Sequence, residues 1–258
     1  MFLSRIKKHL DEQNWFAVFL DLLIVFLAVF VGLQADNWNQ DRIAKSNAKI
    51  YYERLIQDLH AEIDTRESRA AYYTQALKDG EAALQALNQS GNRDDEQLLI
   101  GLYQASQLWN YSPQRATYDE LLAIGIANAI PDADVRGRLA NYYLGLTNSK
   151  EIQQEITPYR QNIRRYMPHD IQIIMREKCG DIFEFRDDGV VLISLPAECE
   201  LGLPETDLES AAAATLQYED LRIDLTHRLG DLENKILNLQ NYVTPSEQII
   251  RQLEALID

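Results

Sequence analysis

An almost unbroken apolar run near the N-terminus constrains this chain more than any other feature. From Phe16 to Leu33 the run carries one charged residue, Asp21. With a rise of ~1.5 Å per residue, such a helix covers roughly 27 Å, close to the hydrocarbon thickness of a bilayer. Trp15 and Trp38 flank the run, as aromatic residues do at membrane interfaces. The sequence therefore predicts a transmembrane helix, with the lipid bilayer as its partner.

Two other interpretations of this run are weaker. A buried helix of a soluble core would keep one polar face, and this run has none. A cleaved signal peptide needs a small residue three positions before the cut, and a cut after Ala35 finds Leu33 there. We therefore expect an uncleaved transmembrane helix over residues 15–35, preceded by a cytoplasmic tail over residues 1–14.

The charges on either side of the run are nearly balanced. Basic residues lie before it and, after two acidic residues, also beyond it. Only the closeness of the preceding basic residues to the run favours a cytoplasmic N-terminus. The residues are Arg5, Lys7 and Lys8 before the run, then Asp36 and Asp41, then Arg42, Lys45 and Lys49.

The two cysteines indicate the compartment in which the chain after the apolar run lies. Cys179 and Cys199 bracket a predicted β-hairpin over residues 180–198, with an Asp188-Gly189 turn. A disulfide across the open ends of a hairpin stabilises by about 3 kcal/mol. Because disulfides persist in oxidising compartments, we expect the bulk of the chain outside the cytoplasm. Two unpaired thiols remain the alternative.

Beyond the apolar run the pattern is mainly helical. Residues 36–88 contain no proline and repeat apolar residues at helical spacing, which predicts a helical stalk. Residues 89–258 then predict a helical domain that contains the hairpin, with a long helical pattern over 203–243. Thr117 and Glu120 have the spacing of a capping box. The expected fold class is mainly α: one transmembrane helix that continues into an antiparallel helical bundle with a small disulfide-closed hairpin.

Composition and motifs argue against several functions. The chain has 258 residues and a formal net charge of -15, which disfavours nucleic acid as a partner. It contains no phosphate-binding glycine loop, no GxSxG and no HExxH. His60 and Asp64 are four residues apart, but two ligands do not make a metal site, so we expect an exposed pair there. We predict no catalytic residues, no metal, no cofactor and no enzymatic activity.

The tyrosines come partly in adjacent pairs. Two neighbouring residues lie about 100° apart on a helix, so both can border one packed face. We interpret the pairs as the edges of a core, with a ligand pocket as the lesser alternative. They are Tyr51-Tyr52, Tyr72-Tyr73 and Tyr142-Tyr143.

A carboxylate at Asp21 lies ~9 Å inside the predicted membrane and is costly there unless it has a partner, a proton or water. One side of the helix carries Asp21 together with the small residues of the run, at spacings of three and four. Small residues let transmembrane helices approach closely. We therefore predict that this stripe faces protein and is an oligomerisation face, with Asp21 as the coupling residue; an Asp tolerated without a partner is the alternative. The stripe consists of Asp21, Val25, Ala28, Gly32, Ala35 and Asp36.

Three segments resemble a family of bacterial single-span membrane proteins of uncharacterised function. The first is "QNWFAVFLDLLIVFLAVFVGLQADNWNQ", in which Gln34, Trp38 and Asn39 match the polar exit of that family's span. The others are "TYDELLAIG" and "LANYY" downstream. The resemblance implies an inner-membrane location and supplies no activity.

The stretch "FLDLLIVFLAVF" also resembles the transmembrane helix of proton-driven motor subunits of the ExbD, TolR and MotB group. In that resemblance Asp21 takes the place of the proton-carrying Asp. The periplasmic domains of the group are mixed α/β, whereas this sequence predicts a helical domain after the span.

Three function classes follow from these observations. The first is a non-enzymatic scaffold or accessory subunit, either a homo-oligomer or bound to a larger membrane protein. The second is a motor or channel subunit that uses Asp21. The third is a ligand sensor in the periplasm, which the short predicted cytoplasmic tail disfavours because it leaves no room for an output domain.

Overall fold

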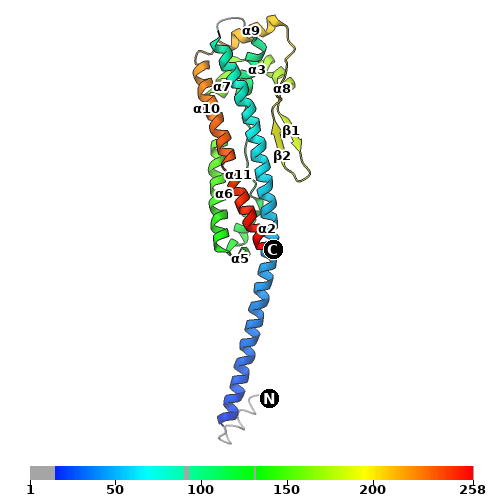
Figure 1. Ribbon diagram of the computed structural model, residues 1–258, viewed down its shortest axis with the longest axis vertical. Helices are drawn as coiled ribbons and strands as arrows, with labels where there is room; N and C mark the ends of the chain where they lie inside the picture. Colours follow the sequence, from blue (N-terminus) through cyan, green and yellow to red (C-terminus); the bar gives the residue numbers. More distant parts are fainter. Residues whose placement is uncertain (1–14, 90–92, 131, 258) are drawn as a thin grey trace.

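The computed structural model describes residues 15–89, 93–130 and 132–257, so the predicted tail over 1–14 lies outside the described residues. It is a helical bundle from which one long helix projects (Figure 1). The elements in chain order are α2 (Trp15–Asn88), α3 (Asp95–Ala105), α4 (Ala116–Ile124), α5 (Ile126–Ala129), α6 (Ala133–Gln154), α7 (Pro158–Tyr166), α8 (His169–Lys178), β1 (Ile182–Phe185), β2 (Val191–Ser194), α9 (Glu205–Thr215), α10 (Leu221–Gln240) and α11 (Val243–Ile257).

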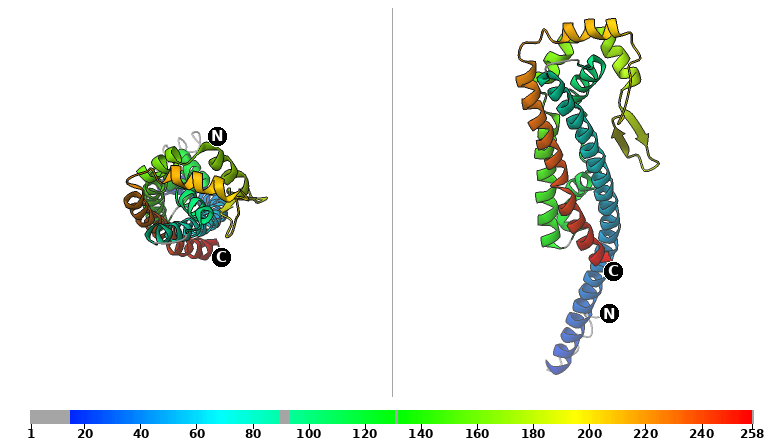
Figure 2. Two further views of the ribbon diagram at one scale, coloured as in Figure 1. Left: turned by 90° about the horizontal axis from the view of Figure 1, so that it is seen from above. Right: turned by 45° about the horizontal axis from the view of Figure 1, so that its top comes forward.

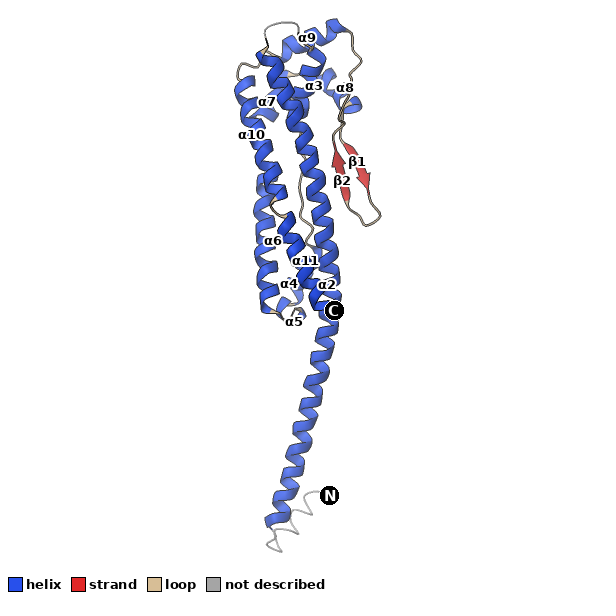
Figure 3. Ribbon diagram, viewed as in Figure 1, coloured by secondary structure: helices blue, strands red, loops and turns tan. Residues whose placement is uncertain are grey.

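Helix α2 is the axis of the molecule. It runs without a break for 74 residues, and its N-terminal part stands alone outside the bundle (Figures 1 and 3). We call this part, Trp15–Asn47, the arm. Among the arm residues whose side chains are described, none is buried, and burial begins at Ala48. Within the arm, Val18–Asp36 is long and apolar enough to cross a membrane, and 0% of it is buried inside the protein.

The rest of α2 is a core helix of the bundle. Most of its buried positions follow one another at alternating spacings of four and three, the period of a helix that packs along one seam, and Thr65, Ala70 and Tyr72 are buried beside them. The seam consists of Ala48, Tyr52, Leu55, Leu59, Glu62, Arg66, Arg69, Tyr73, Ala76, Gly80 and Ala83. The stalk predicted over 36–88 is therefore wrong beyond residue 47, because this seam packs against α3, α10 and α11 and belongs to the domain predicted over 89–258.

Two apolar clusters fill the bundle, one near the arm and one at the far end. The near cluster joins α2 before Ile63 with α4, α6 and α11. The far cluster joins α2 after Arg69 with α3, α7, α9 and α10. A polar layer lies between them on α2, where Glu62, Thr65 and Arg66 are buried. Figure 2 shows the helices as a ring around this core when seen along the long axis.

The hairpin and its disulfide are as predicted. β1 and β2 pair antiparallel, with Ile182 opposite Ser194 and Phe185 opposite Val191. Gly189 adopts a φ of +83° in the connecting turn, a conformation that favours glycine. Cys179 and Cys199 form a disulfide with Cα atoms 5.6 Å apart.

Two local predictions fail. The capping box is wrong because α4 begins at Ala116, one residue before Thr117, so the Thr117 N–H donates to Asp58 (2.9 Å) and Glu120 turns to Arg54. The single long helix over 203–243 is wrong because the chain turns between Thr215 and Leu221 and divides it into α9 and α10. The chain also breaks before Pro158, since α6 ends at Gln154 and α7 begins at Pro158.

Candidate functional site

An extended segment, Ser106–Arg115, is threaded along the inside of the bundle between α3 and α4. It has no strand partner, so its backbone polar groups need other partners once they are removed from water. We call it the strap. Buried arginines supply those partners: Arg228 donates from Nε to the Ala105 carbonyl, 2.9 Å away, and from Nη2 to the Gln107 carbonyl.

Further arginines hold the strap along its length. Arg69 on α2 donates to the Trp109 carbonyl (3.2 Å) and to the Asn110 carbonyl (2.6 Å). Arg164 on α7 donates to Ser106 Oγ (2.9 Å), and its guanidinium carbon lies 3.8 Å from the centre of the Tyr103 ring. Cations from three helices thus bind one irregular segment, which explains why so much positive charge is buried.

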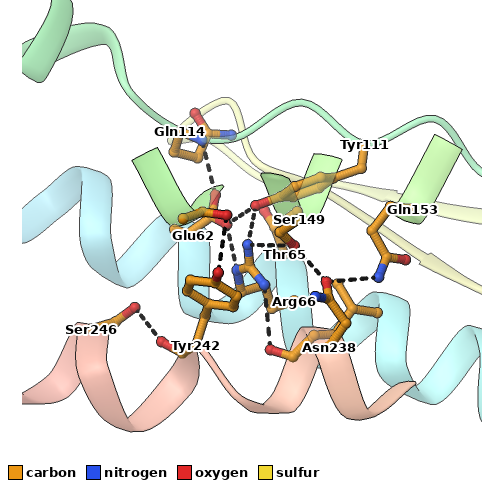
Figure 4. Close-up of polar contacts among 12 residues, drawn as sticks. Glu62, Thr65, Arg66, Tyr111, Gln114, Ser149, Gln153, Asn238, Tyr242 and Ser246 are labelled. Carbon is orange, nitrogen blue, oxygen red and sulfur yellow. Dashed lines mark hydrogen bonds and ion pairs between the residues drawn. The ribbon is translucent and has the colours of Figure 1, made fainter. Parts of the chain in front are cut away.

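The centre of the polar layer is an ion pair between Glu62 and Arg66, one turn apart on α2. Glu62 Oε1 is 2.6 Å from Arg66 Nε, and both side chains are fully buried. The Glu62 carboxylate also accepts hydrogen bonds from the Tyr111 hydroxyl and from the Gln114 N–H, both in the strap (Figure 4). Its two oxygens therefore satisfy three donors, as a buried carboxylate requires.

Aromatic rings complete the environment of Arg66. Its guanidinium carbon lies 5.1 Å from the centre of the Tyr111 ring and 4.6 Å from that of Tyr242. Nη2 also donates to Ser149 Oγ, which in turn donates to Asn238 Oδ1 (Figure 4). The layer thereby ties together α2, α6, α10, the strap and Tyr242 in the turn before α11.

Lys235 is the remaining buried cation of this region. Its Nζ donates to the carbonyls of Ile152, Gln153 and Glu155, at the C-terminal end of α6. Cations are favoured there by the helix dipole. Burial still lowers the pKa of Lys235, since the charged form is removed from water, and it lowers the pKa of Arg69 to about 10 for the same reason.

The buried tyrosines shift in the opposite direction. Burial raises the pKa of the Tyr111 hydroxyl, and the neighbouring Glu62 carboxylate adds to the effect. Two of the three tyrosine pairs behave likewise: burial raises the pKa of Tyr72, Tyr73, Tyr142 and Tyr143. Their side chains are buried and stack edge to face within each pair, which supports their interpretation as core edges.

The polar side chains of this core bind one another and the carbonyls of the strap. Most of its buried polar atoms are paired, although Arg69 Nε and Gln153 Oε1 have no hydrogen-bond partner among the described residues. Such a network is suited to structural specificity, and we interpret it in that way. Sequence reasoning missed it. The signal was nevertheless present, because Glu62, Arg66 and Arg69 occupy positions of the four-three repeat that Leu55 and Leu59 begin.

The stripe predicted from the sequence lies entirely on the arm, on one side of α2. Successive residues of a helix are about 100° apart, so the stripe is roughly opposite the buried face that begins with Ala48 and Tyr52. The large side chains of Phe19, Leu23 and Phe30 lie on the same side as the bundle instead. Gly32 has no atom within 4 Å of an added Cβ, so its place in the stripe is open.

The side of α2 that carries the stripe stays uncovered as the helix enters the bundle. Ile43 and Ile50 are 50% and 54% exposed there. A groove of about 380 Å³ lies beside them, between α2 and the end of α4, and it is lined by Asn47, Ile50, Tyr51, Arg54, Ile124 and Ala129. Arg54 and Glu120 form an exposed ion pair at its edge.

Comparisons with protein-family models, with curated proteins and with solved structures found no match.

Proposed function

We propose that this chain is a single-pass membrane protein that acts without enzymatic activity, as a scaffold or accessory subunit of a membrane complex. Val18–Asp36 is the membrane span in this proposal. It contains 19 residues, which as a helix cover ~28 Å. Its complete exposure supports this role over that of a core helix, because a core helix of a soluble protein would be covered by its own fold.

We place the bundle in the periplasm and the N-terminus in the cytoplasm. The Cys179–Cys199 disulfide supports an oxidising compartment for the bundle. The basic residues Arg5, Lys7 and Lys8, which precede the span, support a cytoplasmic N-terminus. An inner-membrane protein of a bacterium fits both observations.

The observation that carries this proposal is the continuity of α2. One helix is at once the span and the central helix of the bundle. Between Asp36 and Ala48 it rises ~18 Å, so the bundle is held at a fixed distance from the membrane. A rigid mount of this kind suits a subunit that positions a binding surface, whereas a tethered domain would move freely.

The buried polar core fits the same role. Glu62, Arg66 and Arg69 bind the strap and one another, which leaves these side chains engaged in packing. The network makes the bundle a single rigid body that the arm can orient.

Asp21 gives a second candidate, a subunit coupled to the proton-motive force. It lies on the stripe, about one turn inside the N-terminal end of the apolar segment, where a carboxylate is expensive in lipid. A proton-coupled subunit would bind a multi-span partner through this side of the helix.

One experiment separates these candidates. The full-length protein and its Asp21→Asn variant are purified gently from native membranes, and the associated proteins are identified. A scaffold role predicts the same defined complex from both variants. Loss of a multi-span partner or of its transport in Asp21→Asn would favour the proton-coupled subunit. Recovery of the protein from the soluble fraction would contradict both.

A further inference from the structure

The side of α2 that faces away from the bundle is an apolar surface in water. Ile43, Ile50 and Ile124 are each about half exposed. Ile50 and Ile124 line the groove next to Arg54, and Ile43 precedes Ile50 by seven residues on α2. We call this surface, from Ile43 to Gln57 on α2 with the adjoining end of α4, the back face. Adjacent exposed apolar residues of this kind mark interaction surfaces.

The same side of α2 is covered further from the arm by the protein itself. There the hairpin packs on it: Arg186 pairs with Asp64, and the Ser68 hydroxyl binds both the N–H and the carbonyl of Ile193. Figure 1 places the hairpin and α6 on opposite sides of α2. The back face is therefore the part of this side that the bundle's own elements leave uncovered.

We propose that a second copy of this chain covers the back face, so that two α2 helices pack in parallel along the stripe and the back face. This inference rests on the proposed membrane insertion, which gives every copy the same direction and depth. Equivalent residues of two copies then lie at equal height, so each back face meets its equivalent about an axis along the membrane normal.

The geometry of α2 permits this arrangement. The stripe and the back face lie on the side of α2 opposite its buried seam, about 180° away. Two copies joined along this side place α6 and α10 outward. The hairpins lie on the joined side from Asp64 onward, so the two helices must diverge beyond Gln57. A pairing through Phe19, Leu23 and Phe30 would instead drive the bundles into each other.

The available area is sufficient for a weak specific dimer. From Asp21 to Gln57 the uncovered side of α2 is ~54 Å long, and a helix is about 10 Å wide. Each copy then contributes roughly 500 Å², and the total of about 1,000 Å² meets the lower limit for a specific interface.

The test uses full-length protein in native membranes. The two native cysteines form a disulfide, so single cysteines at Ile50 and Gln57 react alone with a short bis-maleimide. Leu144→Cys on α6 is the matched control, because Leu144 is also an isolated exposed apolar residue (63%). We expect at least fivefold more cross-linked homodimer for Ile50→Cys and Gln57→Cys than for Leu144→Cys.

Equal cross-linking at all three positions, or cross-links of Ile50→Cys only to other proteins, would overturn the inference. A second pair of variants tests whether the cross-link depends on the back face. Ile50→Asp should abolish the cross-link at Gln57→Cys. Ile223→Asp, at an exposed position of α10, is the control and should leave it unchanged. Flotation of the same membranes keeps the two proposals apart. Protein that floats without cross-linking disproves only the dimer, whereas protein that fails to float disproves the membrane anchor.

Discussion

Glu62 and Arg66 form a fully buried ion pair on one face of α2, with Glu62 Oε1 2.6 Å from Arg66 Nε. The pair occupies two positions of the buried seam of α2, between Leu59 and Arg69. Such a pair stabilises little by itself, because desolvation offsets the attraction, but the loss of one partner leaves a charge uncompensated. Its place in the fold is to fix how α2, the strap and the other helices fit together.

Glu62→Gln tests the ion pair. The amide keeps the size of the side chain but leaves Arg66 buried without its counter-charge, so the free energy of unfolding should fall by about 3 kcal/mol or more. Glu53→Gln, at an exposed position of α2, is the control and should change it by less than ~0.5 kcal/mol. Denaturant unfolding followed by circular dichroism measures both. Equal midpoints for the two variants would show that the buried pair is not required.

Arg228→Met tests how the strap is held. Arg228 is 1% exposed and binds the carbonyls of Ala105 and Gln107, so its removal leaves them without partners in the core. We expect amide hydrogen exchange in the strap, including the N–H groups of Trp109 and Gln114, to quicken roughly tenfold, equivalent to about 1.4 kcal/mol.

The control for this prediction is Arg138→Met, at an exposed position of α6, which should leave exchange in the strap unchanged. An Arg228→Met variant with wild-type exchange across residues 106–115 would mean that the arginine is not what holds the strap in place.

The chain should unfold in alkali. Burial raises the pKa of nine of the 13 tyrosines above 10, to about 12 for Tyr218. Above pH 10 the unfolded chain releases these protons while the folded chain retains them, so stability is lost as the pH rises through the folded values. Burial lowers the pKa of four basic groups, which act in the opposite sense, but the nine tyrosines outnumber them. These groups are Arg69, Arg160, Arg164 and Lys235.

Absorbance at 295 nm measures this directly, because it reports tyrosinate. We expect most of the signal to appear in one cooperative step that coincides with the loss of helical circular dichroism. A gradual rise centred near pH 10, with the helices intact, would contradict the burial of these hydroxyls.

The helical phase of the arm gives another prediction. Two residues inserted between Ser46 and Asn47 rotate the stripe by about 200° relative to the back face, whereas seven residues rotate it by only about 20°. Cross-linking of Ile50→Cys should fall at least fivefold with the two-residue insertion and return with the seven-residue insertion. Equal cross-linking in both would show that the stripe and the back face do not act as one surface.

Local patterns made part of this fold predictable. The Asp188-Gly189 turn and the disulfide at the ends of the hairpin depend on residues close in sequence, and each has its expected structure. The apolar run is helical, as its local pattern predicts. The four-three repeat of α2 is local as well. The sequence predicts a stalk over residues 36–88 because a local repeat does not show which distant helices cover that face of α2.

The remaining features depend on residues far apart in the chain. Thr117 and Glu120 have the spacing of a cap, but Asp58 and Arg54 on α2 take their hydrogen bonds, and nothing near residue 117 in the sequence indicates this. The strap is likewise irregular because its partners are arginines up to 121 residues away, as for Gln107 and Arg228. Distant side chains of this kind compete with local preference and override it.

The central claim is that one rigid helix joins the membrane span to the bundle, and a distance across their junction tests it most directly. Spin labels at Leu33→Cys and Gln57→Cys, both exposed, are separated by 24 residues of α2, or ~36 Å in a continuous helix. Pulsed electron resonance on protein diluted with unlabelled chain, in lipid, should give one narrow distribution near that value. A broad or much shorter distribution would mean that the helix bends between Asp36 and Ala48, and that the bundle is tethered to the membrane and not mounted on it.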